Sequence, residues 1–170
     1  MVAELLELCG ELKSFTASKP SVQLRKQNKI RTVHHSLAIE GNSLSEEQVT
    51  AILENKRVLG PKNQIIEIQN ALEIYDSLNS FDPVREKDLM RAHKLLMHNL
   101  IQNPGRYRST QVGVFKGSKV SHVAPPSQQV PKLMGDLFFF LKNDKETPWV
   151  VKACIFHYEL EFIHPFSDGN

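Results

Sequence analysis

The segment from Pro148 to Phe162 constrains the fold more than any other part of the sequence, because it is apolar on most sides of a helix. Its apolar residues are Val150, Val151, Ala153, Cys154, Ile155, Phe156, Leu160 and Phe162. This pattern is typical of a core helix, so we expect it at the centre of a helical bundle. Pro165 ends the helix, because proline cannot continue its hydrogen bonding. The residues around Pro165 are therefore presented from a buried scaffold.

Most of the remaining chain also shows apolar residues at helical spacing, interrupted by proline or glycine. We expect helices over about 1–16, 22–39, 45–54, 61–79, 89–100 and 130–141. Ser45 and Gln48 form a predicted capping box, and Gly41-Asn42 predicts the end of the preceding helix. The first helix, with leucines on one face only, is expected at the periphery. The sequence thus predicts an all-α fold, a helical bundle.

One segment departs from the helical pattern. Two short strands are predicted around a glycine-containing turn, with the residues Val112, Gly113, Val114 and Phe115 in the first and Val120, Ser121, His122 and Val123 in the second. An isolated hairpin is marginally stable in water, so this one must pack against helices. By itself it is best interpreted as a cover over one edge of the core.

Composition limits the classes of partner. The 170 residues are 41% hydrophobic, and 21 basic against 19 acidic residues give a net charge of +2. These values fit one globular unit and carry no electrostatic signature of a nucleic-acid or membrane-surface binder. No run approaches the roughly 20 apolar residues of a membrane span. Cys9 and Cys154 lie far apart without metal spacing, which favours a reducing cytoplasm.

The seven residues His164-Pro165-Phe166-Ser167-Asp168-Gly169-Asn170 carry the candidate chemistry. Imidazole can act as a general base near neutral pH, and a carboxylate is a hard oxygen ligand suited to Mg²⁺. Glycine lets the backbone approach an anion closely. Each signal is weak alone, since Asp-Gly-Asn is an ordinary turn sequence. Together, after an apolar helix, they indicate phosphate chemistry.

This run resembles the active-site motif of the Fic family (filamentation induced by cAMP), which continues with Gly-Arg and, two residues later, a second Arg. The resemblance implies transfer of AMP from ATP to a hydroxyl of a target protein, with His164 as the catalytic base and Asp168 holding Mg²⁺. The resemblance also implies that Phe166, which anchors the loop, belongs to the nucleotide-binding residues together with Gly169 and Asn170, which line the phosphates. Because the sequence ends at Asn170, we expect a C-terminally incomplete domain with impaired activity.

A second match lies upstream. Ser36-Leu37-Ala38-Ile39-Glu40-Gly41 resembles the inhibitory motif of Fic proteins that carry their own brake. Ser36 and Glu40 share one helical face, and a carboxylate near a helix C-terminus is unfavourable by up to about 1 kcal/mol. Standing alone, Glu40 would be interpreted as a surface residue. Beside the active-site motif, the resemblance implies that Ser36, Glu40 and Gly41 belong to an auto-inhibitory helix over about 22–40.

The resemblance also implies the domain organisation and the partners. It implies an N-terminal helical region over 1–60 and a Fic-like core over 61–170, with the hairpin as a flap that docks the target by strand addition. The implied partners are ATP and a target protein. Neither nucleic acid nor a membrane is an expected partner, and a homodimer is possible. Two alternatives remain: a non-catalytic peptide-binding module that uses the flap, and a hydrolase that removes AMP through the same residues.

His93 falls on an apolar stripe of the helix predicted over 89–100. A single histidine there has no ligand partner in the nearby sequence. We therefore favour a structural, hydrogen-bonded role for His93 over a metal-binding or catalytic one.

Overall fold

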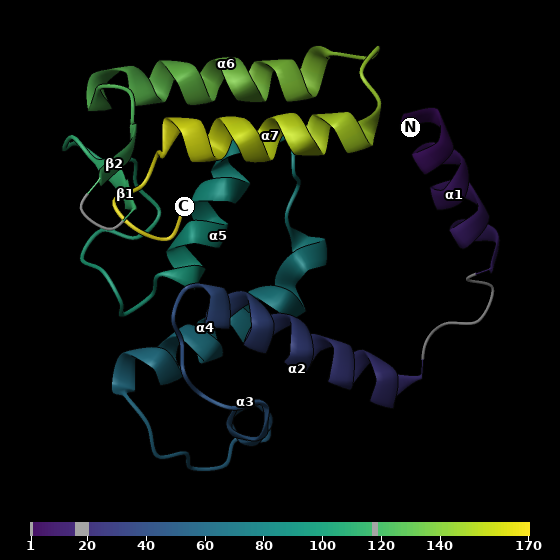
Figure 1. Ribbon diagram of the computed structural model, residues 1–170, viewed down its shortest axis with the longest axis vertical. Helices are drawn as coiled ribbons and strands as arrows, with labels where there is room; N and C mark the ends of the chain where they lie inside the picture. The colour runs from purple at the N-terminus through teal and green to yellow at the C-terminus, as the bar shows by residue number, and fades with distance from the viewer. Residues whose placement is uncertain (1, 16–20, 117–118) are drawn as a thin grey trace.

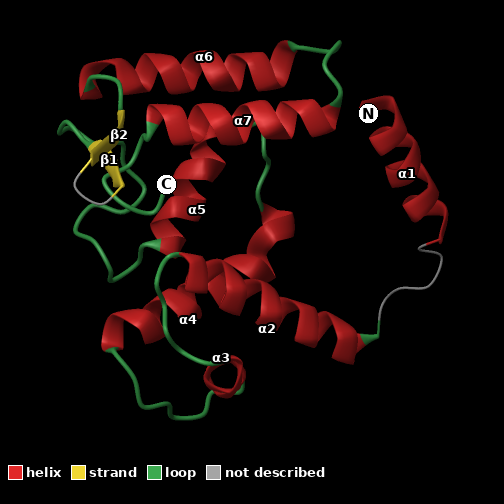
Figure 2. Ribbon diagram, viewed as in Figure 1, coloured by secondary structure: helices red, strands yellow, loops and turns green. Residues whose placement is uncertain are grey.

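The computed structural model describes residues 2–15, 21–116 and 119–170. Its helices are α1 (Val2–Phe15), α2 (Val22–Ile39), α3 (Glu46–Leu53), α4 (Lys62–Ser77), α5 (Glu86–Leu96), α6 (Val130–Asn143) and α7 (Trp149–Ile163), with short 3₁₀ turns at Leu78–Ser80 and Ser127–Gln129. The strands are β1 (Gly113–Lys116) and β2 (Lys119–Val123). Helices dominate the fold (Figure 2), which confirms the predicted mainly α class.

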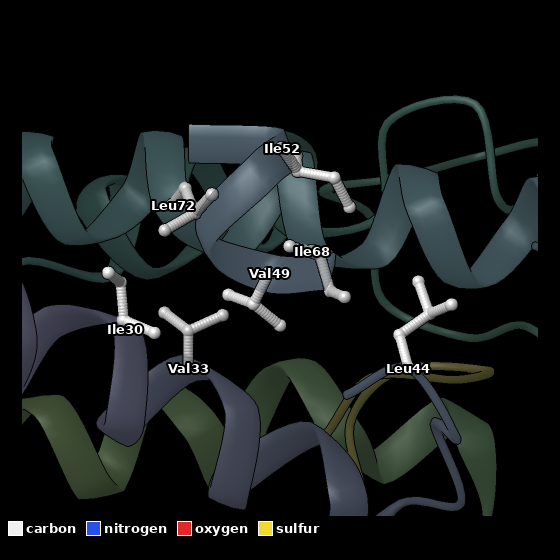
Figure 3. Packing of buried hydrophobic residues seen from close by; sticks show 7 residues of the cluster. All are labelled: Ile30, Val33, Leu44, Val49, Ile52, Ile68 and Leu72. Atoms are coloured by element: carbon white, nitrogen blue, oxygen red, sulfur yellow. The ribbon is translucent and has the colours of Figure 1, made fainter. Parts of the chain in front are cut away.

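The first core lies where α2 and α3 pack against α4 (Figure 3). It consists of Ile30 and Val33 from α2, Leu44, Val49 and Ile52 from the α3 region, and Ile68 and Leu72 from α4. This core therefore spans the boundary expected near residue 60. The α2 helix has the bounds predicted from the sequence, although the proposed break at Ser18 and Pro20 lies outside the described residues.

Local hydrogen bonds set the turn between α2 and α3. Gly41 adopts φ +92°, a left-handed conformation that favours glycine, directly after the helix. The predicted capping box is present: the Ser45 hydroxyl accepts from the Gln48 amide, and the Gln48 side chain accepts from the Ser45 amide. Between them, the Asn42 side chain donates to the Gln64 carbonyl at 3.0 Å and to Glu67 at 2.8 Å. The end of α2 is thereby tied to α4.

The second core lies between α6 and α7, which run side by side (Figure 1). Its buried residues are Val130, Met134, Leu137, Phe138 and Ile163. The expectation that α7 is a central helix is wrong for the described residues, in which Tyr158 is 65% exposed and Ile163 is the single buried residue of α7. Apolar residues all round a helix indicate burial but do not say which element supplies the cover, and in the described chain α6 covers one side.

The remaining elements connect these two cores. The α5 helix contacts both α4 and α6, and it ends at Leu96 instead of the predicted Leu100. The hairpin follows, with β1 and β2 paired antiparallel and a register shift between Val114 and Phe115. Its position agrees with the prediction to within one residue, and its turn at 117–118 lies outside the described residues.

The α1 helix lies at the periphery, as predicted, and leaves Leu5, Leu8 and Leu12 exposed (Figure 1). Among the described helices, none is both long enough and apolar enough to cross a membrane. Cys9 and Cys154 are free thiols. The cytoplasmic location stays a prediction.

Candidate active site

A cavity of about 530 Å³ brings together two sequence motifs that are more than a hundred residues apart. Glu40, at the end of α2, and His164, at the end of α7, both line it. The other lining residues are Leu37, Asn63, Glu67, Leu96, Met97, Leu100, Glu161, Ser167, Asp168, Gly169 and Asn170. The lining therefore comes from four helices and the residues directly after them, and from the segment 164–170, which we call the motif loop.

His164 marks the point where α7 becomes the motif loop. Its backbone is left-handed, with φ 48° and ψ 64°, and its amide donates to the Leu160 carbonyl at 2.8 Å. Such a conformation is uncommon for a residue other than glycine and turns the chain sharply away from the helix axis. Pro165 then prevents any continuation of the helix. The turn brings the loop that begins at His164 to the cavity wall.

Arg108 holds this turn from inside the protein and was not singled out in the sequence. Arg108 is 5% exposed. Its guanidinium donates to the carbonyls of His164 (2.7 Å), Ile163 (3.2 Å), Pro125 (2.6 Å) and Thr110 (2.9 Å). Burial lowers the pKa of Arg108, although arginine stays charged. A cation at a helix C-terminus is favourable, because the last carbonyls carry partial negative charge. Arg108 therefore fixes the motif loop to the base of the hairpin.

His93 is buried and contacts the motif loop from the protein interior, so its predicted structural role is confirmed. The Gly105 amide donates to Nδ1 at 2.7 Å, which places the proton on Nε2, and Nε2 then donates to the Asp168 carbonyl at 2.9 Å. The ring also stacks on Phe166, with 3.7 Å between centroids. Burial lowers the pKa of His93, while the bond to Asp168 opposes that shift. Acceptance from the Gly105 amide requires the neutral imidazole, because a protonated Nδ1 has no free lone pair.

Phe166 is 1% exposed and anchors the loop, as the resemblance implied. It lies against His93 and is not among the described residues that line the cavity. Tyr107 packs near it at 5.6 Å between centroids and donates to Glu86 at 2.8 Å. Burial and this bond raise the pKa of Tyr107. The contribution of Phe166 to ligand binding is therefore indirect, through the position of the loop.

Asn170 closes the motif loop on itself. Its side-chain oxygen accepts from the Phe166 amide at 2.6 Å, and its side-chain nitrogen donates to the Phe166 carbonyl at 3.2 Å. Gly169 adopts φ +71°, a left-handed conformation that favours glycine. A Cβ there would also push against the flexible end of the Met97 side chain, just after α5. Gly169 and Asn170 both line the cavity.

The cavity is strongly acidic. Glu40, Glu67, Glu161 and Asp168 line it, and its described lining includes neither lysine nor arginine. The Asp168 carboxylate is exposed and accepts from the Gly169 amide at 2.8 Å. Carboxylate oxygens are the ligands that Mg²⁺ prefers, usually in company with water and substrate phosphates. The Asp168 carboxylate would therefore fit a magnesium ion that also binds substrate phosphates.

Leu37 and Glu40 are the residues of the inhibitory match that line the cavity, and Glu40 is the charged one. Ser36 and Gly41 are exposed, and neither belongs to the described lining. The tie from Asn42 to α4 keeps the end of α2 at the cavity wall. Glu40 and His164 thus belong to one site, although sequence reasoning could place them together only through the family resemblance.

The hairpin begins and ends beside the motif loop (Figure 1). Gln111 donates across its base to the Ala124 carbonyl at 2.7 Å, and Arg108 joins both ends of the hairpin to α7. Val112 is half-buried, and Val123 is 66% exposed. The predicted flap and the motif loop therefore share one point of attachment.

The fold and the site define a mainly helical domain with one hairpin and a histidine-containing loop that faces an acidic cavity. A family model described as "Fic/DOC family" matches residues 83–170. The chain belongs to the Fic/DOC family.

Individual proteins agree with this assignment. The chain is 31% identical to the "Protein adenylyltransferase Fic" of Nematostella vectensis over 90% of its own length and 37% of the relative. It is likewise 31% identical to the "Protein adenylyltransferase fic-1" of Caenorhabditis elegans, over 100% and 35% of the two lengths. A solved Fic family protein from Desulfovibrio desulfuricans G20 is 49% identical, with a TM-score of 0.89 over 99% of this chain and 51% of that one. The chain thus spans little more than a third of the length of the Nematostella vectensis and Caenorhabditis elegans relatives.

Proposed function

We propose that this protein transfers AMP from ATP to a Ser, Thr or Tyr hydroxyl of a target protein, under inhibition by Glu40. One observation carries the proposal: the motif loop with His164 and the inhibitory match with Glu40 line one cavity. The names of the relatives, which are adenylyltransferases, support the same reaction. ATP is the proposed nucleotide and Mg²⁺ the proposed metal.

The reaction assigns a role to each residue of the loop. His164 accepts the proton of the target hydroxyl, whose oxygen bonds to the α-phosphorus of ATP while the bond from that phosphorus to the bridging oxygen breaks. Pyrophosphate leaves, and AMP stays on the target. Asp168 would hold Mg²⁺, which would supply positive charge to the phosphates. Gly169 and Asn170 supply backbone to the phosphate side of the cavity.

Glu40 is the proposed inhibitor because a carboxylate at this cavity repels the terminal phosphate of ATP. At about 4 Å, two unit charges repel by about 4 kcal/mol for the effective dielectric near a protein surface. In the family pattern, the carboxylate also pairs with the second arginine after the motif. Replacement of Glu40 by glycine would therefore remove the repulsion of the terminal phosphate. It would also free that arginine to donate hydrogen bonds to the phosphate.

The proposed target-binding surface is the flap. An extended peptide would add as a strand to the hairpin, whose base is attached to the motif loop through Arg108. The target hydroxyl would thereby approach His164. The non-catalytic alternative uses the same surface without ATP.

The test is protein labelling with ATP that carries a radioactive α- or γ-phosphate, in the 170-residue chain and in the protein extended by its own reading frame. AMP transfer labels protein from the α-phosphate alone. His164→Ala should abolish labelling in the extended protein and leave ATP affinity nearly unchanged, because imidazole acts on the hydroxyl. We expect no detectable labelling by the 170 residues. Labelling that survives in His164→Ala would refute the assignment of the base.

Glu40→Gly supplies the second arm of the test. It should raise labelling by about 10-fold to 100-fold in the extended protein, the equivalent of about 1.5–3 kcal/mol for a restored charge-assisted hydrogen bond. It should change little in the 170-residue chain. Equal effects in both backgrounds would show that Glu40 acts without the arginine.

The reverse reaction is a second candidate, and the position of Glu40 in the cavity with His164 favours it. A carboxylate can orient a water molecule, which would then attack the phosphorus of an AMP-modified hydroxyl. Incubation with a pre-labelled target distinguishes the two reactions. Release of AMP that is lost in Glu40→Gly identifies the hydrolase, whereas unchanged label excludes it.

A further inference from the structure

Two neighbouring histidines of α2 and the first residue of α3 form a cluster outside the cavity. One ligand atom from each of His34, His35 and Glu46 lies within 4.8 Å of the others, the one such group of potential metal ligands among the described residues. The two imidazole rings are 4.9 Å apart between centroids and inclined by 58°. None of the three residues belongs to the active site described above.

The fold places these residues together. Val33, next to His34, is buried in the first core, where α2 packs against α3. The capping box at Ser45 fixes the first turn of α3, which begins at Glu46. Adjacent residues on a helix project in different directions and rarely share a partner. Here the start of α3 supplies a carboxylate that both histidines can reach.

The groups around the cluster favour a cation. Nδ1 of His34 is buried and, within the described residues, has no hydrogen-bond partner. A buried polar atom without a partner is unfavourable, so this ring is not already stabilised at Nδ1. Glu47, the next residue of α3, accepts from the Ser45 hydroxyl at 2.6 Å. The first turn of α3 therefore carries two carboxylates.

One cation competes for the same carboxylate. Arg31 lies 3.6 Å from Glu46, with 63% of its side chain exposed. This separation is longer than that of a good charge-assisted hydrogen bond, and the pair is solvated, so it is weak. A metal ion can displace it.

We propose that His34, His35 and Glu46 bind a divalent transition-metal ion of the Zn²⁺ class, with water in the remaining position. Two imidazoles and a carboxylate are a zinc donor set, with bonds of about 2.0–2.2 Å. Tetrahedral coordination at these lengths needs ligand atoms about 3.4 Å apart. From separations of up to 4.8 Å, the ligand atoms must therefore close by at most about 1.4 Å. This is feasible because His35 is exposed and the Glu46 side chain is 43% exposed.

The position of the site gives it a consequence for regulation. A bound ion would join the last turns of α2 to α3, and Glu40 follows His35 by about one and a half turns. The end of α2 would then be held more firmly at the cavity wall. This regulatory part rests on the proposed function, whereas metal binding itself does not.

Metal binding is tested by calorimetric titration of the untagged chain with zinc chloride, in a buffer that does not chelate the ion. We expect one saturable site, weakened about tenfold or more in His35→Ala and in Glu46→Gln. Both side chains are partly or fully exposed, so these variants should fold, as circular dichroism will check. His157→Ala, which removes an exposed histidine from α7, is the matched control and should bind as the unmodified chain does. Arg31→Met should bind more tightly, because it removes the competing cation.

The possible outcomes distinguish metal binding at this site from an effect of the metal on AMP transfer. The site would be overturned if the unmodified chain showed no saturable zinc binding. It would also be overturned if His35→Ala and Glu46→Gln bound zinc as tightly as the unmodified chain. Cobalt in place of zinc should give the intense visible bands of tetrahedral coordination, and weak octahedral bands would contradict the proposed geometry. If zinc binds at this site but does not alter AMP transfer, the site stands and its link to Glu40 is overturned. If the protein transfers no AMP at all, the calorimetric result is unaffected.

Discussion

At the scale of single residues, the site depends on side chains that do not touch the cavity. Arg108 and His93 are both buried, and both hydrogen-bond to the backbone of the motif loop. The first caps the turn at His164, and the second supports the segment from Phe166 to Asp168. A loop that carries the proposed catalytic base must keep its geometry without substrate, and these two residues supply that order.

Arg108→Met should destabilise the protein by about 3–5 kcal/mol. The substitution keeps much of the side-chain volume but leaves four carbonyl groups without their charged donor. Urea unfolding measures the difference. Arg106→Met, at an exposed neighbouring position, is the control and should cost less than about 0.5 kcal/mol. A loss below about 1 kcal/mol for Arg108→Met would mean that water replaces the guanidinium.

The pKa of His93 predicts a dependence of stability on pH. Because burial lowers this pKa in the folded protein, the unfolded chain takes up the proton first as pH falls. The contribution of His93 is therefore complete above the ordinary histidine pKa of about 6.5 and is lost as pH falls from there toward the lowered value. Protonation also ends acceptance from Gly105.

Urea unfolding at about pH 7.5 and about pH 5.5 tests this prediction. His93→Gln can keep a donor and an acceptor but cannot titrate, so it should lose less stability between the two pH values than the unmodified protein. The other histidines contribute equally to both proteins and cancel in the comparison. Identical pH dependence would show that His93 is already protonated or exposed in the folded state.

At the scale of elements, the start of α3 is defined by a local motif. The capping box at Ser45 and Gln48 satisfies two amides that the helix cannot satisfy itself. The same turn presents Glu46, a ligand of the proposed metal site. The stability of this short helix and the geometry of the cluster are therefore linked.

Ser45→Ala should cost about 1 kcal/mol, because it removes the acceptor for the Gln48 amide. Thermal unfolding measures the change. Ser45→Asp preserves an acceptor and should retain most of the stability, which separates loss of the cap from a general effect of substitution. Similar losses in both variants would contradict the capping role.

At the scale of the whole molecule, the described chain has two cores and one peripheral helix. The α4 helix lies in the first core, where Ile68 is 1% exposed, whereas α1 leaves Leu12 65% exposed. Local stability follows the amount of buried apolar contact. The elements that form the cavity therefore belong to the more stable part.

Amide hydrogen exchange should reveal this difference directly. We expect α1 to exchange much faster than α4 and α6, because its helical hydrogen bonds open without loss of a core. Mass spectrometry of peptides from each helix measures the rates. Protection of α1 equal to that of α4 would show that its leucines are covered in solution.

The sequence by itself determined the features that depend on neighbouring residues. Helical spacing, Gly41 and the Ser45 capping box set the ends of α2 and the start of α3, because these signals act within one or two turns. The position of the hairpin followed in the same way from its alternation and its turn. The motif at 164–170 also indicated phosphate chemistry through its residue types alone.

Only the tertiary structure decided which distant residues meet. Arg108 contacts His164, which lies 56 residues later in the sequence, and His93 contacts Asp168, which lies 75 residues later. No local sequence pattern could predict either contact. The same holds for Glu40, whose exposed position on α2 becomes a cavity wall only after α2 packs on α4. Apolar spacing also misplaced α7, since it specifies that a helix face prefers burial and not which neighbour covers it. Local hydrogen bonds are determined by residues close together in the sequence, whereas packing depends on the path of the whole chain.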